Sequence, residues 1–258
     1  MTFRVALIGT GWVADHHIRA LKSLSDVRLV AIAGRNRERT RELSLRAEAR
    51  AYDFGEAASM LKSESLDAVF LCLPPHLHGE LEQRCAEHVP AVFIEKPITC
   101  DLEVARRASE AFAKAGTLVS VGFMCRYRES VARAKAALES SGEVPILING
   151  SWVGDVPGPL WWRTQAQSGG QFVEQCTHMV DLARYLAGPI EEVAAYATRG
   201  FVTEHPDYSV DDAAVVNVRF KSGAIGNFTT GCFIKPGHAS ALGIGLTLQA
   251  RSVQCLSL

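Results

Sequence analysis

Two different patterns of apolar positions divide the chain. Over the first half, short apolar runs alternate with longer stretches of helical periodicity, which predicts alternating buried strands and helices. Strands that alternate with helices indicate a parallel sheet with helices on both faces. The predicted strands are Arg4–Ile8, Val27–Ala33, Asp67–Leu73, Ala91–Ile94 and Thr117–Val121, and the predicted helices are Val13–Leu24, Arg37–Ala47, Leu77–His88 and Leu102–Ala115.

The pattern changes near Cys125, where we place a domain boundary. Beyond it we predict a helix, a long strand, a loop rich in Gly, Pro and Trp, a second helix, and four strands joined by short turns. Consecutive strands without helices between them predict an antiparallel sheet. The fold class is therefore an α/β domain over residues 1–125 followed by an α+β domain over residues 126–258. The predicted elements of the second domain are Glu129–Glu139, Pro145–Val153, Glu174–Ala187, Glu192–Arg199, Ala213–Phe220, Ala224–Phe233 and Leu242–Ala250.

Composition and charge exclude several classes of protein. The 258 residues are 48% hydrophobic, and 27 Lys and Arg against 28 Asp and Glu leave a net charge of -1. This balance gives no electrostatic attraction to nucleic acid or to an anionic membrane surface. No apolar run reaches the roughly 18 residues of a membrane span, and the N-terminus lacks a signal-peptide pattern. Seven scattered cysteines without a CxxC pair favour reduced thiols and a cytoplasmic location over disulfides or zinc.

A glycine motif follows the first predicted strand and opens the first predicted helix. Gly9 allows a tight turn, Gly11 lets the backbone approach a pyrophosphate, and Ala14 keeps helix and strand close. The free N–H groups of a helix N-terminus then face the phosphates. We expect a dinucleotide here rather than a glycine turn without a ligand, with cofactor contacts from Gly9, Thr10, Gly11, Trp12 and Val13.

The end of the second predicted strand decides between two cofactors. An acidic residue at this point would bind the free 2′-hydroxyl of NAD, but the sequence has Gly34, Arg35 and Asn36. Arg35 can pair with a 2′-phosphate and Asn36 can donate to it, so NADP is preferred and NAD is the alternative. The neighbouring Arg37 and Arg39 are better explained as a solvated basic face.

Two further strand ends carry polar or turn-forming residues. Glu95 and Lys96 end the strand Ala91–Ile94, and in a doubly wound sheet the ligand lies outside the carboxyl ends of the strands. The Lys96 ammonium can stabilise developing alkoxide charge on a substrate, the alternative being an ordinary surface lysine. The preceding strand ends at Leu73 and Pro74, which with His78, Glu95 and Lys96 complete the expected cofactor contacts. His76 and His78 lack the companions of a metal site.

A polar stripe runs along the predicted helix that ends at Ala187. At about 100° per residue, Glu174, His178, Asp181 and Tyr185 share one face of an otherwise apolar helix. His178 suits proton transfer near neutral pH, and Glu174 can orient it or bind the substrate. The alternatives are a wet helix face and a histidine satisfied within the structure. A metal site is not expected, because a third ligand is not evident.

Three segments together resemble one family: GTGWVA at the start, EKP after the strand Ala91–Ile94, and SGGQFVEQCTHMVDLARYL near residue 175. The chain is similar over essentially its whole length to the glucose–fructose oxidoreductase, inositol dehydrogenase and MocA-type (Gfo/Idh/MocA) family. The resemblance implies a Rossmann domain followed by a domain with an open antiparallel sheet. It also implies hydride transfer between a nicotinamide cofactor and a sugar, polyol or related hydroxyl compound.

The resemblance also implies roles for individual residues. Lys96 is similar to the catalytic lysine of the family and His178 to its catalytic histidine, while Glu174 stands where the family commonly has a substrate-binding Asp. In the loop that follows Pro157, Trp162 and Arg163 are expected as substrate contacts. The alternative function on the same fold is a non-catalytic nucleotide-binding sensor or regulatory protein.

The chain ends sooner than members of this family usually do, soon after a predicted strand. We therefore expect a domain shortened at its C-terminus and an edge strand open to pairing with another chain. The family also commonly pairs through the outer face of this sheet. The expected partners are a small-molecule substrate and further copies of the chain, as a dimer or tetramer.

Overall fold

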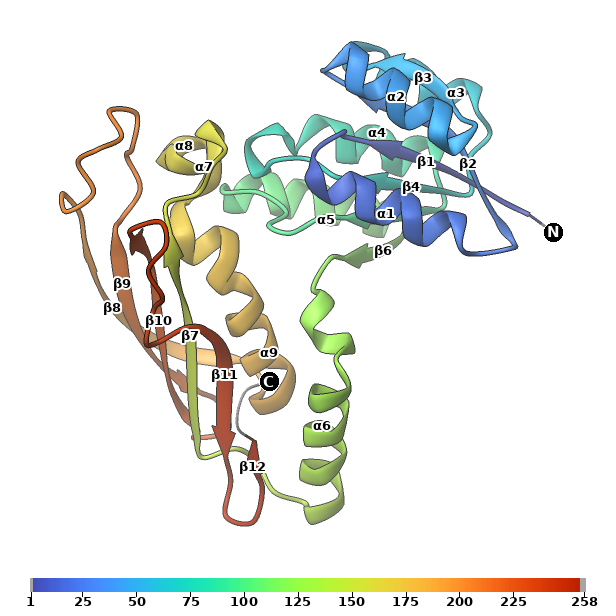
Figure 1. The fold of residues 1–258 in the computed structure, drawn as a ribbon. Coiled ribbons are helices and arrows are strands. Elements are labelled where there is room, and N and C mark those ends of the chain that lie inside the picture. The colour runs from blue at the N-terminus through green and yellow to red at the C-terminus, as the bar shows by residue number, and fades with distance from the viewer. Residues whose placement is uncertain (1, 256–258) are drawn as a thin grey trace. The chain divides into compact units, whose positions relative to one another are not determined.

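The structure of the protein, a computed structural model, describes residues 2–255 (Figure 1). Residues 256–258, the C-terminal end of the domain that was expected to be shortened, lie outside the described residues. The chain divides into two compact units, the first ending at Gly122 and the second beginning at Phe123. Each unit contains one six-stranded sheet, and we describe the two units separately.

The first unit is a doubly wound α/β domain whose described strands have the order β3-β2-β1-β4-β5-β6. Every neighbouring pair in this sheet is parallel, as the alternation of strands and helices predicted. The strands are β1 (Phe3–Ile8), β2 (Val27–Gly34), β3 (Arg50–Asp53), β4 (Ala68–Leu71), β5 (Ala91–Ile94) and β6 (Leu118–Val121), and the helices are α1 (Trp12–Lys22), α2 (Arg37–Ala47), α3 (Ala57–Ser63), α4 (Glu80–His88) and α5 (Leu102–Ala115).

Both faces of this sheet are buried. Along β1, Val5 and Leu7 enter an apolar cluster with residues of α1 and α2, whereas Ala6 and Ile8 enter a second cluster with residues of α3, α4 and α5. Successive side chains of a strand point to opposite faces, so the two clusters lie on the two sides of the sheet. The continuous apolar run of β1 is therefore the sign of a strand covered on both faces.

The second unit contains a mixed sheet whose described strands have the order β12-β11-β7-β10-β9-β8. Strands β8, β9 and β10 form the antiparallel series that the short turns predicted. The rest differs from the expected all-antiparallel sheet, because β7 lies between β10 and β11 and runs parallel to β10. The strands are β7 (Leu147–Asp155), β8 (Ile190–Thr198), β9 (Ala213–Phe220), β10 (Ile225–Ile234), β11 (Ile244–Gln249) and β12 (Gln254–Cys255).

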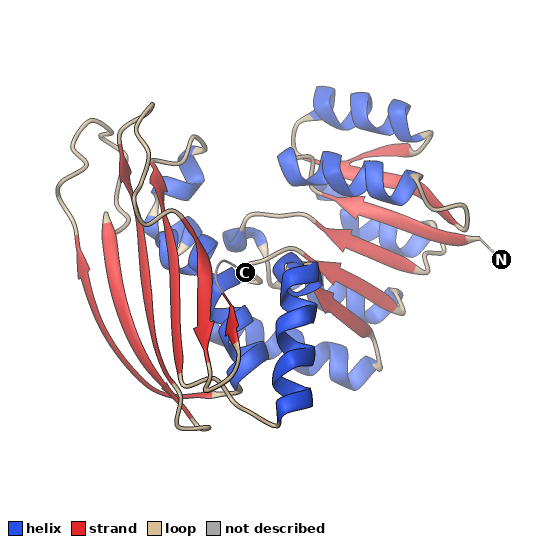
Figure 2. Cartoon of the chain, turned by 60° about the horizontal axis from the view of Figure 1, so that its bottom comes forward, coloured by secondary structure: helices blue, strands red, loops and turns tan. Residues whose placement is uncertain are grey.

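Helices pack on one face of this second sheet (Figure 2). Met179 and Leu182 of α9 and Val131 of α6 share an apolar cluster with Phe220 and Phe228 of the strands. A five-residue π-helix precedes α9 directly, so the polar stripe predicted on a single regular helix is carried by two kinds of helix. The helices are α6 (Glu129–Ser141), α7 (Leu160–Arg163), α8 (Gln165–Ser168), the π-helix Phe172–Cys176 and α9 (Thr177–Ala187).

None of the helices within residues 2–255 combines the length and the apolar character that crossing a membrane requires.

Candidate active site

The glycine turn between β1 and α1 has the shape that a dinucleotide requires. Gly9 has a φ of 111°, and a Cβ at this position would lie 2.0 Å from the carbonyl oxygen of Cys72. Around Gly11, by contrast, no atom lies within 4 Å of such a Cβ, and no side chain caps the start of α1. The turn therefore presents open backbone and uncapped N–H groups, which fit a pyrophosphate.

The end of β2 lies against this turn. A Cβ on Gly34 would meet the side chain of Thr10 at 2.6 Å, so the end of β2 and the glycine turn are in contact. Arg35 follows with an exposed side chain. Asn36, which was expected to contact the cofactor, also caps α2. Its side-chain oxygen accepts a hydrogen bond from the backbone N–H of Arg39 at 3.0 Å.

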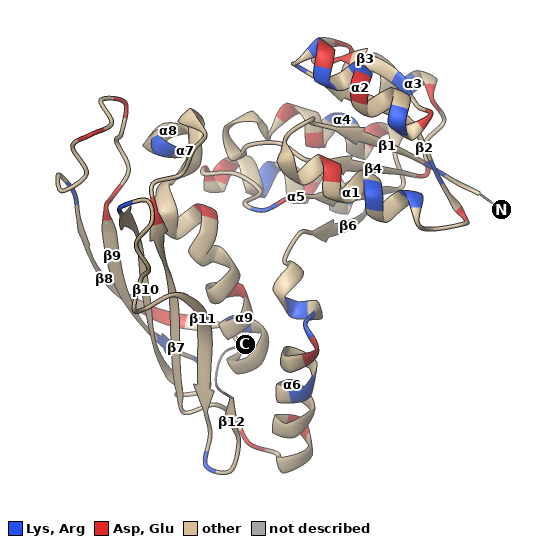
Figure 3. Cartoon of the chain, in the orientation of Figure 1, with Lys and Arg blue, Asp and Glu red and all other residues tan. Residues whose placement is uncertain are grey.

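The arginines of α2 mostly pair with carboxylates. Figure 3 shows both basic and acidic positions along this helix. Arg37 lies 2.7 Å from Asp53 at the end of β3, and Arg39 lies 2.7 Å from Glu42. Both arginines thus belong to a solvated face of mixed charge, whereas no ion pair to Arg35 is found within the described part of the chain.

The turn after β4 is held by a buried histidine. The side chain of His78 is fully buried. Its Nδ1 is hydrogen-bonded to Glu82, and its Nε2 lies 3.1 Å from the carbonyl oxygen of Leu73. Its side chain is therefore turned to the interior and ties α4 to the end of β4. This placement gives the imidazole a structural role, and the expected cofactor contacts of His78, Leu73 and Pro74 stay predictions.

Lys96 follows β5 at the same edge of the sheet and is half-buried. The preceding Glu95 uses both carboxylate oxygens within the protein: Oε1 lies 2.7 Å from His17 Nε2, and Oε2 accepts from the Lys96 N–H at 3.2 Å. Sequence reasoning expected Glu95 among the cofactor contacts and missed His17. The pattern gives no sign of this pair, because the two residues come from distant elements.

In the second unit, the polar stripe before Ala187 is buried. Glu174 is 5% exposed, His178 2% and Asp181 5%, so the stripe is not a wet helix face. Glu174 lies in the π-helix, a form frequent at functional sites, and His178 lies in the first turn of α9. The indole of Trp152 on β7 stacks on the His178 ring with centroids 5.8 Å apart, which restrains the imidazole.

A partly buried ion pair anchors the same helix. Arg126 donates to Asp181 through two nitrogens, Nε at 2.7 Å and Nη2 at 2.5 Å, in a bidentate arrangement. The carboxylate of Asp181 raises the pKa of Arg126. Asp181 is thus occupied by a structural partner, whereas Glu174 and His178 carry the acid–base chemistry available on this stripe.

Cys176 lies two positions before His178 without adding a nucleophile. Burial raises the pKa of its thiol to about 12, so the group stays protonated near neutral pH. The described residues also contain no group of three or more His, Cys, Asp or Glu side chains arranged to hold a metal ion.

The loop after β7 uses its arginine to hold two segments together. Arg163 Nε donates to the Pro157 carbonyl at 2.7 Å, and Nη1 lies 3.3 Å from His205 Nδ1. Trp162 stacks on Trp161 with centroids 5.5 Å apart. The Arg163 guanidinium thus organises the loop, and its expected substrate contact stays a prediction, as does that of Trp162.

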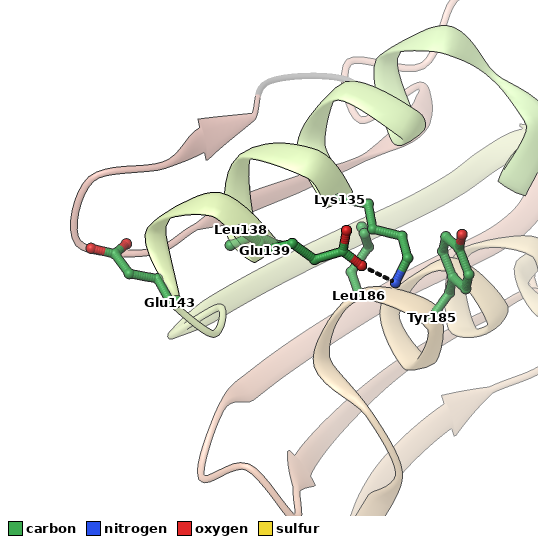
Figure 4. Close-up of a pocket in the computed structure, with 7 residues that line it drawn as sticks. Lys135, Leu138, Glu139, Glu143, Tyr185 and Leu186 are labelled. Carbon is green, nitrogen blue, oxygen red and sulfur yellow. Dashed lines mark ion pairs between the residues drawn. The ribbon is translucent and has the colours of Figure 1, made fainter.

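A separate cavity of about 230 Å³ lies between α6 and α9 (Figure 4). Lys135 pairs with Glu139 at 3.0 Å, and its ammonium lies 4.7 Å from the centre of the Tyr185 ring. Neither Glu174 nor His178 lines this cavity. It is therefore distinct from the candidate site on the π-helix and α9.

Comparison with known proteins bears on both units. Residues 3–123 match the model described as "Oxidoreductase family, NAD-binding Rossmann fold" (GFO_IDH_MocA), and residues 131–248 match the "GFO/IDH/MocA C-terminal domain". The chain is 30% identical to the scyllo-inositol 2-dehydrogenase (NAD(+)) of Bacillus subtilis over 87% of its length, and 32% identical to the myo-inositol 2-dehydrogenase of Thermotoga maritima over 86%. It spans 66% of each of these two relatives, slightly less than two thirds.

Solved structures show the same architecture. One of them is the crystal structure of the WlbA dehydrogenase from Chromobacterium violaceum in complex with NADH and UDP-GlcNAcA. Its sequence is 25% identical to this chain, and the two structures match with a TM-score of 0.86 over 98% of this chain and 73% of that one. A probable dehydrogenase from Thermotoga maritima is 27% identical, with a TM-score of 0.77 over 95% of this chain and 71% of that one. These matches confirm the predicted fold class, with the second sheet mixed rather than antiparallel.

Proposed function

Because this chain belongs to the Gfo/Idh/MocA oxidoreductase family, we propose that it transfers a hydride between a nicotinamide dinucleotide and a hydroxyl or carbonyl carbon of a sugar, polyol or related small molecule. The observation that carries the proposal is the turn between β1 and α1. There, Gly9 fits against Cys72 only because it lacks a Cβ, and Gly11 leaves open space before an uncapped helix. Two inositol dehydrogenases among its relatives support the substrate class.

The proposed chemistry divides between residues of the two units. A nicotinamide dinucleotide held at the turn from Gly9 to Val13 would supply the group that accepts or donates the hydride. In the oxidative direction, the imidazole of His178 takes the hydroxyl proton as the carbon loses its hydride, and it returns that proton in the reductive direction. The ammonium of Lys96 donates to the substrate oxygen and stabilises its developing negative charge. Glu174 accepts a hydrogen bond from a neighbouring hydroxyl.

The test is turnover of a panel of polyols and aldoses with oxidised cofactor, followed by the absorbance of reduced nicotinamide. We expect Lys96→Met and His178→Ala to lower turnover about 10²–10⁴-fold while cofactor still binds, because each removes charge stabilisation or acid–base catalysis. Lys114→Met and His238→Ala are matched controls, since both side chains are exposed outside the proposed site.

Two outcomes would contradict this proposal. Turnover close to that of the wild-type protein in both site variants would remove Lys96 and His178 from the chemistry. Tight cofactor binding without turnover of any substrate, in either direction, would favour the alternative of a nucleotide-binding sensor or regulatory protein on this fold.

For the cofactor, we propose NADP ahead of NAD. The support is the exposed Arg35 at the end of β2, where no acidic residue is present to bind a free 2′-hydroxyl. Arg35→Ala is expected to raise the Kd of NADP about tenfold and to change that of NAD far less, because a charged hydrogen bond to phosphate is lost. Arg41→Ala, an exposed change on α2, is the control in the same titration.

We also propose that the chain forms a homo-oligomer through the outer face of the second sheet and acts in the cytoplasm. A groove of about 470 Å³ runs over this face, lined by Leu147, Ala194 and Ile225 among others. Tyr196 on the same sheet is 83% exposed, and charged side chains are sparse along β7 and β10 (Figure 3). Exposed apolar surface of this kind marks interaction sites.

A further inference from the structure

A chain of two hydrogen bonds joins helix α1 to Lys96. His17 Nε2 on α1 lies 2.7 Å from Glu95 Oε1, although the two residues are 78 positions apart. The other oxygen, Oε2, accepts from the backbone N–H of Lys96 at 3.2 Å. An ionised carboxylate only accepts hydrogen bonds, so an imidazole paired with one donates its Nε2–H. The helix that opens at the glycine turn is thereby connected to the residue proposed to stabilise the substrate oxygen.

Aromatic packing fixes the orientation of the His17 ring. Its centroid lies 5.4 Å from that of Phe70 on β4 and 5.0 Å from that of Phe93 on β5, and the two phenyl rings stack at 4.8 Å. The side chains of His17 and Glu95 are 20% and 12% exposed. A partly desolvated hydrogen bond between restrained groups holds its geometry better than one between mobile surface side chains.

The Glu95 carboxylate is also restrained from its other side. A Cβ on Gly122, at the end of β6, would lie 2.8 Å from Oε2, so the absence of a side chain makes room for this carboxylate. Burial raises the pKa of Cys72 well above its ordinary value, and the charge of Glu95 raises it further. The Glu95 carboxylate is therefore held beside the segment that packs on Gly9.

We propose that His17 is a positioning residue for Lys96 and acts through Glu95. The proposal rests on the function assigned to Lys96 above. Without the Nε2–H donor, Glu95 Oε1 loses its partner, the carboxylate can rotate, and the Lys96 N–H loses a defined acceptor. The lysine then samples orientations in which its ammonium misses the substrate oxygen, and displacements of this kind are costly in rate.

Two substitutions separate the hydrogen bond from the packing. His17→Gln keeps an N–H donor at a similar reach and loses the ring, whereas His17→Phe keeps a ring against Phe70 and Phe93 and loses the donor. We expect His17→Phe to lower kcat about 10–100-fold with the Kd of NADP changed less than about twofold. His17→Gln should retain most of the wild-type kcat. His88→Gln and His88→Phe are matched controls, because the His88 side chain has a similar exposure of 25%.

A second readout does not need turnover. Reductive methylation with ¹³C-formaldehyde labels the lysines, and the loss of one resonance in Lys96→Arg assigns Lys96. We expect the Lys96 resonance to shift in His17→Phe and to stay near its wild-type position in His17→Gln, with thermal unfolding confirming that both variants are folded.

The outcomes are distinguishable. If His17→Phe leaves kcat and the Lys96 resonance unchanged, or if both variants are impaired equally, the positioning role through the hydrogen bond is wrong. If the wild-type protein turns over no substrate while the resonance still moves only in His17→Phe, the oxidoreductase function fails and the positioning of Lys96 by His17 stands.

Discussion

The two six-stranded sheets of this chain place their chemistry in different ways. The parallel sheet of the first unit is buried on both faces, so its candidate groups lie at the ends of β1, β2, β4 and β5. The mixed sheet of the second unit is covered on one face, and its candidate groups lie on the covering helix instead. Strand β8 at its edge is exposed along almost its whole length. A sheet with two buried faces offers ligands its ends, whereas a sheet with one buried face can use the helix above it.

Among substitutions that compare the two units, we expect the largest effect on stability and nucleotide binding at the glycine turn of the first unit. Gly9→Ala forces a side chain into a positive φ and to within 2.0 Å of the Cys72 carbonyl, which costs about 1–3 kcal/mol from strain alone and more from the overlap. We expect a destabilised first unit and loss of nucleotide binding, measured by urea unfolding and nucleotide titration.

Gly11→Ala serves as the matched variant at this turn. No atom lies within 4 Å of its added Cβ, so stability should stay near the wild-type value while nucleotide affinity falls. Equal effects of the two substitutions on folding would contradict the distinction between a packed glycine and a ligand-facing one.

A core substitution under α9 is expected to have an effect of similar or slightly smaller size. Phe228 on β10 is fully buried, and its ring fills the space beside Gly150, where a Cβ would lie 2.7 Å from Cδ1. Phe228→Ala should lower the free energy of unfolding of the second unit by about 3–5 kcal/mol, measured by urea denaturation. Ile225→Ala, on the same strand but 50% exposed, should cost far less. Comparable losses would show that both faces of this sheet are packed.

The smallest effect on folding is expected on the outer face of the mixed sheet. Tyr196→Lys adds a charge to a position of this face that is 83% exposed, and surface changes of this kind usually shift stability by about 0.5 kcal/mol or less. If copies of the chain pair through this face, the substitution should lower the molar mass measured by light scattering. An unchanged mass in an oligomeric protein would place the interface elsewhere.

The sequence predicted the first unit well because its signals are local. Apolar runs that end at glycine or at Glu95 identify β1 and β5 directly, and the glycine motif marks its own place in the fold. The strand Arg50–Asp53 and the helix Ala57–Ser63 escaped prediction, because the strand is short and begins and ends with a charged residue.

In the second unit, local signals did not predict features that depend on contacts between distant segments. Short turns predicted which strands follow one another, but the insertion of β7 beside β10 depends on contacts between distant segments. Helical spacing placed Glu174 and His178 on one stripe, yet it could not show that the stripe is buried or that it begins in a π-helix. The pair of His17 and Glu95 was invisible for the same reason, since each residue is unremarkable in its own segment.

The parallel pairing of β7 and β10 has a consequence for how this unit reaches its native state. Partners such as Trp152 and Thr230 are 78 residues apart, and the π-helix, α9, β8 and β9 all lie between them. The chain loses conformational entropy when so long a loop closes, and this loss precedes the stabilising contacts. Domains rich in such pairings therefore fold slowly. During synthesis on the ribosome, β7 therefore stays unpaired with β10 until β10 has emerged. Before that point, the apolar face of α9 has no complete sheet to pack against.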